Sequence, residues 1–143
     1  TIKGAHNIEL KADVLFDEIC YDDADILVLP GGMPGTLNLR NHEKLCALLN
    51  EFAAKDKKIA AICAAPMIFG ELGLLKGRKA TCYPGFEDKL AGAEVCTERV
   101  VRDGNITTSR GLGTAIPFAL ELISQLYGKE KAEEIKKSVI YGH

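Results

Sequence analysis

The sequence predicts a doubly wound α/β domain with a mostly parallel sheet and some antiparallel additions. Strand-like and helix-like segments alternate along the chain, as βαβ units require. The continuous apolar runs at 25–30 and 59–63 are typical of central strands in a parallel sheet. Extended stretches on both sides of Asp103-Gly104 predict an antiparallel hairpin. With 143 residues, the chain is expected to form one domain, 1–143.

The first half of the chain is expected to supply short extended pieces, a buried strand and a long helix. Residues 7–10 and 14–19 are the short extended pieces. The strand at 25–30 ends in a glycine-rich loop, after which Asn41 is expected to cap a helix running to about residue 57. The apolar stripe of this helix comprises Leu45, Leu48, Leu49 and Phe52.

The second half repeats the alternation. After the strand at 59–63, a short helix is expected to run through Leu72 and to end at the glycine that follows it. A short strand at 79–82 and the hairpin come next. A helix over 114–127, with Ile116, Ala119, Leu120 and Ile123 on one face, and an amphipathic helix over 129–138 complete the chain.

Composition argues against several classes of function. A net charge of −2 provides no basic stripe for nucleic acid or an acidic membrane surface. No apolar segment approaches the ~20 residues of a membrane span, and no cleavable signal is visible, so we expect a cytoplasmic protein. The number of cysteines is odd, and they lack C-x-x-C spacing, so neither a disulfide framework nor a metal site is expected.

Cys63 is the candidate nucleophile. It ends the apolar run Ile59-Ala60-Ala61-Ile62, and the small residues around it would permit a sharp strand-to-helix turn. Pro66 fits the first turn of the following helix. A thiolate there would be favoured by the helix dipole, by about 0.3–1 kcal/mol when exposed. The alternative is that Cys63 is a small buried hydrophobe at the end of a core strand.

The glycine-rich loop Gly31-Gly32-Met33-Pro34-Gly35 lacks the features of a nucleotide site. It has neither the Gly-Lys-Ser/Thr ending of a phosphate loop nor the spacing of a dinucleotide fingerprint. The backbone amides of Gly32 and Ala64 could instead form an oxyanion hole beside the sulfur of Cys63. The alternative is a tight turn before a helix.

Three motifs in this order and spacing closely resemble the ThiJ/PfpI superfamily. The resemblance is carried by residues 27–32 (LVLPGG), 60–66 (AAICAAP) and 108–114 (TSRGLGT). It extends over essentially the whole chain and is greatest for the branch that contains the Parkinson-associated protein deglycase and its bacterial relatives named after thiazole biosynthesis.

The resemblance implies a flavodoxin-like three-layer sandwich, usually a homodimer, with Cys63 as nucleophile beside the Gly32 and Ala64 amides. The implied function is a cysteine-dependent, cofactor-free glyoxalase or deglycase that acts on small reactive aldehydes or their adducts; amidase or protease action is known in some branches. The alternative is a non-enzymatic redox-sensing or chaperone-like stress protein that uses the same oxidisable cysteine.

Two departures from the family pattern concern the groups around Cys63. The family normally opens with a strand, a helix and a strand before the point where Thr1 begins, and that piece carries a glutamic acid that hydrogen-bonds the cysteine. We therefore expect a separate N-terminal fragment of the same protein, a cleaved segment or an incomplete record. Tyr83 and Ala64 occupy positions where some relatives have histidines, so the sequence does not support a Cys-His dyad.

Three further residues are candidates for the pocket. Arg110 could hold an anionic group, and Tyr83 could form a pocket wall with a hydrogen bond. His6 lies in a segment that in relatives approaches the dimer interface and the pocket mouth. For His6 and Arg110 the alternative is a structural role, in interface packing or in the loop.

Overall fold

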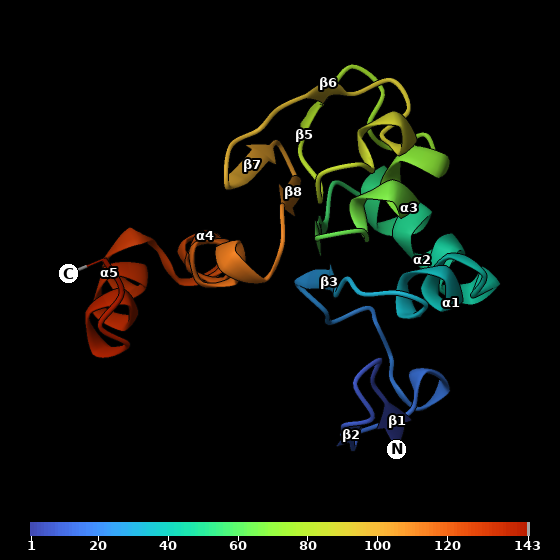
Figure 1. The fold of residues 1–143 in the computed structure, drawn as a ribbon, viewed down its shortest axis with the longest axis horizontal. Helices are drawn as coiled ribbons and strands as arrows, with labels where there is room; N and C mark the ends of the chain where they lie inside the picture. Colours follow the sequence, from blue (N-terminus) through green and yellow to red (C-terminus); the bar gives the residue numbers. More distant parts are fainter. Residues whose placement is uncertain (143) are drawn as a thin grey trace.

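Residues 1–142 are described by a computed structural model, which is a three-layer α/β sandwich (Figure 1). The strands are β1 (Ile2–Lys3), β2 (Glu9–Leu10), β3 (Ile26–Leu29), β4 (Lys58–Ile62), β5 (Lys79–Ala80), β6 (Glu94–Val95), β7 (Val100–Asp103) and β8 (Ile106–Ser109). The α-helices are α1 (Gly35–Arg40), α2 (Glu43–Ala54), α3 (Pro66–Glu71), α4 (Ala115–Tyr127) and α5 (Lys129–Ser138). In Figure 1, α1, α2 and α3 lie on one side of the main sheet, and α4 and α5 lie on the other.

The main sheet has the strand order β3-β4-β8-β7. β3, β4 and β8 run parallel, whereas β7 pairs antiparallel with β8. The apolar segment Ile59-Ala60-Ala61 of β4 is fully buried between two neighbouring strands and two helical layers. The predicted flavodoxin-like sheet with an antiparallel hairpin is therefore confirmed.

The helix predicted to be capped by Asn41 and to run to about residue 57 is present as α2, which ends earlier, at Ala54, and α1 was not predicted. The chain forms two helices there, α1 and α2, and α2 begins after His42 instead of Asn41. The Nδ1 atom of His42 accepts a hydrogen bond from the Leu45 N–H at 3.1 Å, so the imidazole caps α2. The predicted stripe is correct for Leu45, Leu49 and Phe52, which are buried against the sheet.

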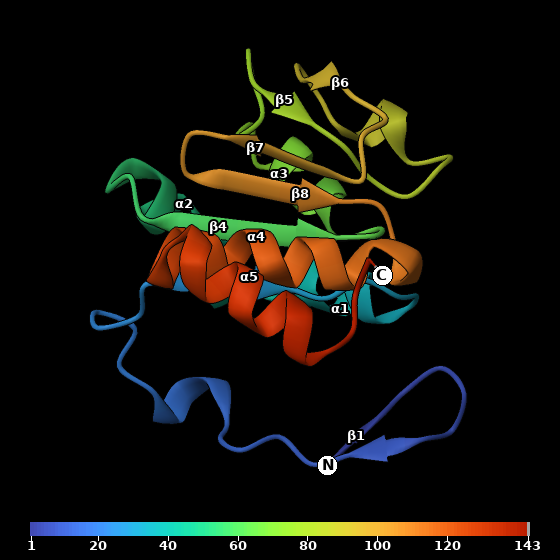
Figure 2. The same cartoon turned by 90° about the vertical axis from the view of Figure 1, so that its left-hand side faces the viewer.

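The N-terminal segment also departs from the prediction. Residues 14–19 do not form a strand; they contain a 3-10 turn over Phe16–Glu18, in which the Glu18 carboxylate accepts a hydrogen bond from the Leu15 N–H at 2.9 Å. β1 and β2 form a small hairpin of their own, which lies apart from the main sheet at the bottom of Figures 1 and 2.

The helices of the other layer follow the predicted boundaries closely. α4 ends at Gly128, whose φ of 90° suits glycine, and α5 begins at the next residue. Figure 2 shows both helices in front of the sheet. The expected apolar face of α4 is only partly covered: Ile116, which is 46% exposed, and Ala119 are exposed, and Leu120 and Ile123 are half-buried. The buried residue of this helix, Phe118, does not belong to the predicted face. No helix in residues 1–142 combines the length and hydropathy that a membrane span needs.

β3 forms one edge of the main sheet. Its only partner in residues 1–142 is β4, and the side chain of Val28 is 45% exposed. This exposure is unusual for an apolar strand of a parallel sheet, which is ordinarily covered on both faces. The edge opposite β4 therefore presents unpaired backbone groups beside an uncovered valine.

Candidate functional site

Cys63 lies at the abrupt turn between β4 and α3. It follows the last residue of β4, and Pro66 opens α3. The backbone of Cys63 has φ = 67°, a left-handed conformation that costs a non-glycine residue about 1–3 kcal/mol. The side chain is neither fully buried nor fully exposed. The predicted strained turn is therefore present, and it carries the thiol.

Two backbone hydrogen bonds hold the turn in place. The Cys63 N–H donates to the Ser109 carbonyl at 3.0 Å, and the Cys63 carbonyl accepts from the Tyr83 N–H at 2.8 Å. These bonds connect the turn to the ends of β8 and of the segment that follows β5. Because both bonds join main-chain groups, they hold the backbone of residue 63 in place whichever side chain it carries.

The loop beneath Cys63 is organised by Ser109 and Thr114. The Ser109 hydroxyl donates to the Arg99 carbonyl at 2.6 Å and lies 2.7 Å from the Thr114 hydroxyl. The Thr114 Oγ1 atom also accepts from the N–H groups of Arg110, at 3.2 Å, and Gly111, at 3.0 Å. We did not assign Ser109 or Thr114 a role from the sequence, although both belong to the third motif at 108–114.

Gly31 makes the closest approach to Cys63 from the glycine-rich loop. A Cβ placed on Gly31 would lie 2.5 Å from the Cys63 Cβ and 3.2 Å from its Sγ. Gly32 follows Gly31 in the sequence, and Ala64 follows Cys63. These are the two predicted oxyanion-hole residues. The hydrogen bonds within residues 1–142 leave the N–H groups of both residues without an acceptor.

No carboxylate in residues 1–142 hydrogen-bonds the Cys63 sulfur. Burial makes three of the other cysteines poor nucleophiles. Burial raises the pKa of Cys82 to about 11, and burial likewise raises the pKa values of Cys46 and Cys96. Cys63 differs from them by its left-handed backbone, by its close contact with Gly31 and by the neighbouring Ala64 N–H, which has no acceptor in residues 1–142.

A cleft of about 460 Å³ opens beside this turn. It is lined by Tyr83 and Arg110, two of the predicted pocket residues, but not by Cys63 itself. The phenol of Tyr83 is 48% exposed and makes an edge contact with Phe86, with ring centroids 6.4 Å apart. His6 is exposed in the β1–β2 hairpin, which lies apart from the main sheet in Figure 2 and does not line the cleft. A contact between His6 and the pocket thus stays a prediction for an assembled dimer.

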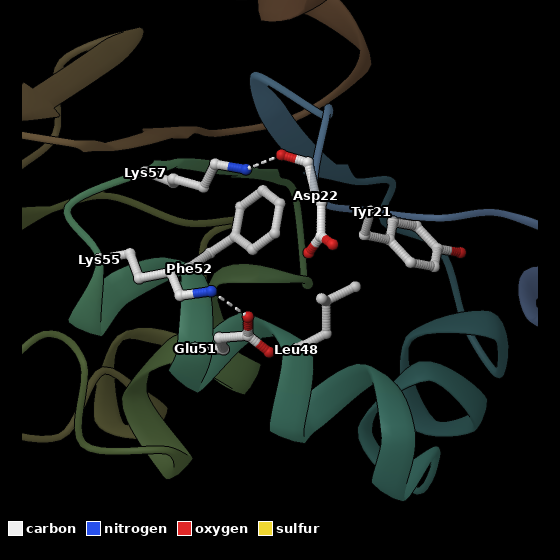
Figure 3. Close-up of a pocket in the computed structure, with 7 residues that line it drawn as sticks. All are labelled: Tyr21, Asp22, Leu48, Glu51, Phe52, Lys55 and Lys57. Carbon is white, nitrogen blue, oxygen red and sulfur yellow. Dashed lines mark hydrogen bonds and ion pairs between the residues drawn. The ribbon is translucent and has the colours of Figure 1, made fainter.

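A second depression, of about 610 Å³, lies between α2 and Tyr21-Asp22 (Figure 3). Most of its charged side chains have partners within it. The Lys57 ammonium donates to the Asp22 backbone carbonyl at 2.7 Å and lies 4.6 Å from the centre of the Phe52 ring, while Lys55 pairs with Glu51. Among the lining residues, the Asp22 carboxylate alone forms no ion pair or hydrogen bond in residues 1–142. Residues 1–142 also contain no cluster of three or more His, Cys, Asp or Glu side chains that could hold a metal ion.

The left-handed backbone of Cys63 leads to a prediction about stability. We expect Cys63→Gly to be more stable than Cys63→Ala by about 1 kcal/mol, because glycine adopts φ = 67° without the Cβ penalty. Urea unfolding of the two variants measures this difference. Equal stability, or a more stable alanine variant, would show that the turn is not strained.

Comparisons with known proteins agree with the motifs. The model of the DJ-1/PfpI family matches residues 1–125. "Protein DJ-1 homolog A" of Arabidopsis thaliana is 41% identical over 140 residues, which are 97% of this chain and 36% of that protein. "Deglycase PfpI" of Pyrococcus furiosus is 38% identical over 127 residues, which are 87% of this chain and 76% of that protein.

The structural comparison extends the likeness to the fold. The crystal structure of Drosophila melanogaster DJ-1beta matches with a TM-score of 0.94 and 33% sequence identity, over 99% of this chain and 77% of that one. The chain spans about a third of the length of DJ-1 homologs A and B from Arabidopsis, 36% and 32% respectively. The family model, the sequence relatives and the fold agree: the chain belongs to the DJ-1/PfpI family.

Proposed function

We propose that the chain is a cysteine-dependent, cofactor-free enzyme of the glyoxalase or deglycase type, acting on small reactive aldehydes or their adducts through Cys63. The observation that carries the proposal is the strained Cys63 turn, with φ = 67°, in close contact with Gly31. In this proposal the amides of Gly32 and Ala64, which have no acceptor in residues 1–142, face the sulfur. Relatives named deglycases, 38% identical in the Pyrococcus furiosus case, support the reaction class.

The proposed reaction begins at the aldehyde carbon. The thiolate of Cys63 forms a C–S bond there, and the electron pair of the C=O bond moves to the oxygen. The Gly32 and Ala64 N–H groups would stabilise that oxyanion, and its protonation gives a hemithioacetal. For a 2-oxoaldehyde, transfer of the hydrogen from the former aldehyde carbon to the neighbouring ketone carbon oxidises the first and reduces the second, which gives a 2-hydroxy thioester. Water then breaks the C–S bond, releasing the 2-hydroxy acid and restoring the Cys63 thiol. No external oxidant or reductant is consumed.

Proton transfer in this scheme needs an acid or base near the sulfur. Because no carboxylate in residues 1–142 hydrogen-bonds Cys63, we propose that the glutamic acid of the family is supplied by the strand-helix-strand segment. The free edge of β3 and its exposed Val28 are suited to receive such a strand. In this proposal, residues 1–143 are one domain that is completed by that segment.

We also propose that the chain acts as a homodimer in the cytoplasm. Ile2, Ile8 and Leu10 of the β1–β2 hairpin are 61–65% exposed, and a partner surface would cover them. Dimerisation would also offer His6 a route to the pocket of the second copy. All five cysteines are free, in keeping with a reducing compartment.

The test is conversion of methylglyoxal to lactate by the purified chain without any added cofactor. We expect lactate to accumulate in proportion to the protein concentration. Supplying the family's strand-helix-strand segment should raise the rate. The proposed reaction would be contradicted if no lactate forms, either with the chain alone or with the added segment. A cooperative unfolding transition shows that the protein used in this test is folded.

A non-enzymatic redox-sensing or chaperone-like role is the second candidate. It is favoured by one observation: the Cys63 side chain is partly exposed, whereas Cys82 is 2% exposed and has a pKa of about 11. Mass spectrometry after mild peroxide treatment tests this role. Selective sulfinate formation at Cys63 without any turnover would favour the sensor, and uniform oxidation of all five cysteines would exclude it.

A further inference from the structure

The cleft beside Cys63 contains two arginines that have no counter-ion. Arg40, Arg78 and Arg102 each lie within 3.5–3.7 Å of a carboxylate oxygen. Arg99 and Arg110 form no ion pair with residues 1–142, and both line the cleft. The lining includes no aspartate or glutamate. The cleft therefore has two arginines and no acidic side chain in its lining. Arg99 also lines a neighbouring depression that includes Glu121 and Glu133.

The sheet itself brings these two arginines together. In the antiparallel pairing of β7 with β8, Val100 lies opposite Ser109, and Arg99 and Arg110 are the residues directly beyond this last pair. The hydrogen bond from the Ser109 hydroxyl to the Arg99 carbonyl, at 2.6 Å, holds the two segments together at this end. Two like charges on neighbouring segments repel each other, and a bound anion would relieve that repulsion.

The Arg110 guanidinium retains donors for a ligand. Its Nε donates to the Cys82 carbonyl at 3.4 Å and its Nη1 to the Thr97 carbonyl at 3.5 Å, and both bonds are long. The remaining N–H groups of the planar fork are free to bind a carboxylate in a bidentate manner. The nearby carboxylate of Glu98 accepts from the Thr97 N–H at 3.0 Å and does not line the cleft.

The cleft is connected to Cys63 through two adjacent backbone contacts. Tyr83, one wall of the cleft, donates its N–H to the Cys63 carbonyl, and Ser109, which precedes Arg110, accepts from the Cys63 N–H. Arg110 therefore lies one residue away from a group in direct contact with the candidate nucleophile, and the Arg99 carbonyl is hydrogen-bonded to the same Ser109. A volume of about 460 Å³ accommodates a ligand of a few carbon atoms.

We propose that Arg99 and Arg110 form a carboxylate subsite that binds small 2-hydroxy acid and 2-oxo acid anions in preference to neutral compounds of the same shape. The proposal rests on the proposed function in one respect: the 2-hydroxy acid is the product of that reaction. The subsite would hold the carboxylate as it forms, and the enzyme would be inhibited by its own product.

The test is calorimetric titration of the chain with lactate and with lactamide, its neutral isostere. We expect lactate to bind and lactamide to bind at least about tenfold more weakly. Arg110→Gln and Arg99→Gln should each weaken lactate binding by about 10- to 100-fold, whereas Arg110→Lys, which keeps the charge without the fork, should lie between. Arg102→Gln is the matched control, since Arg102, on β7, pairs with Glu121 of α4 and does not line the cleft; it should change lactate binding less than twofold.

Two outcomes would overturn the subsite. One is equal affinity for lactate and lactamide. The other is unchanged lactate affinity in both glutamine variants, provided that these variants unfold like the original chain. Titration of Cys63→Ser separates this inference from the proposed reaction. Lactate should still bind to that variant, because the arginines remain. Lactate binding without any methylglyoxal turnover would contradict the reaction alone, and turnover without lactate binding would contradict the subsite alone.

Discussion

Cys63→Ala is expected to lower methylglyoxal turnover by about 1000-fold or more. In the proposed reaction, this variant lacks the atom that forms a covalent bond with the aldehyde, and the remaining backbone donors can only stabilise an oxyanion that no longer forms efficiently. The fold should survive, because alanine is smaller than cysteine and the turn is held by main-chain bonds to Ser109 and Tyr83. Lactate formation at saturating and at low methylglyoxal measures the loss.

Cys20→Ala is the matched control for this experiment. Cys20 is exposed and lies outside the main sheet, so its replacement should leave turnover unchanged. A Cys63→Ala variant that retains a rate within a few-fold of the original chain would remove the cysteine from the mechanism. A loss of equal size in both variants would point to damage unrelated to the site.

Gly31→Ala is expected to disturb both stability and activity. The new Cβ would lie 2.5 Å from the Cys63 Cβ and 2.8 Å from the Ile62 carbonyl oxygen, so the backbone of one loop would have to move. Overpacking against rigid backbone costs about 1–3 kcal/mol of unfolding free energy, and sometimes more. Any relaxation also shifts the thiol relative to the Gly32 and Ala64 amides, so turnover should fall by at least about tenfold.

Gly35→Ala provides the matched control, because a Cβ at Gly35 meets nothing within 4 Å and the residue opens α1. That variant should be as stable as the original chain or slightly more stable, since alanine favours helix. Urea unfolding and lactate formation are measured on both variants. A Gly31→Ala variant as stable and active as Gly35→Ala would show that the loop and the turn are not in close contact.

The periodicity of apolar residues was sufficient to predict the layered architecture. Buried runs predicted β3 and β4, and glycine following an amphipathic stretch predicted the end of α4 at Gly128. The start of α2 after His42 was not predicted, because capping depends on side-chain geometry. Here an imidazole nitrogen accepts the capping hydrogen bond that an Asn, Asp, Ser or Thr side chain usually accepts. The stretch at 14–19 was misassigned because a few apolar residues in a row fit a strand or a turn equally well.

The candidate site could be predicted only where it depends on local sequence. Small residues before Pro66 predicted the strained turn at Cys63, and Tyr83 and Arg110 do line the neighbouring cleft. The contributions of Gly31 and Ser109 were not predicted, because their distances to Cys63 are set by the register of three strands distant in sequence. Periodicity identifies which face is buried, and register decides which atoms meet there.

The uncovered side of β3 has a consequence for handling the protein. A strand that presents free N–H and C=O groups beside an apolar side chain is a template for pairing with another chain, and Val28 lies in the middle of this one. A solution of this chain alone is thus expected to associate and aggregate as its concentration rises. Rates and melting temperatures measured on it would vary with dilution, unless another strand occupies that edge.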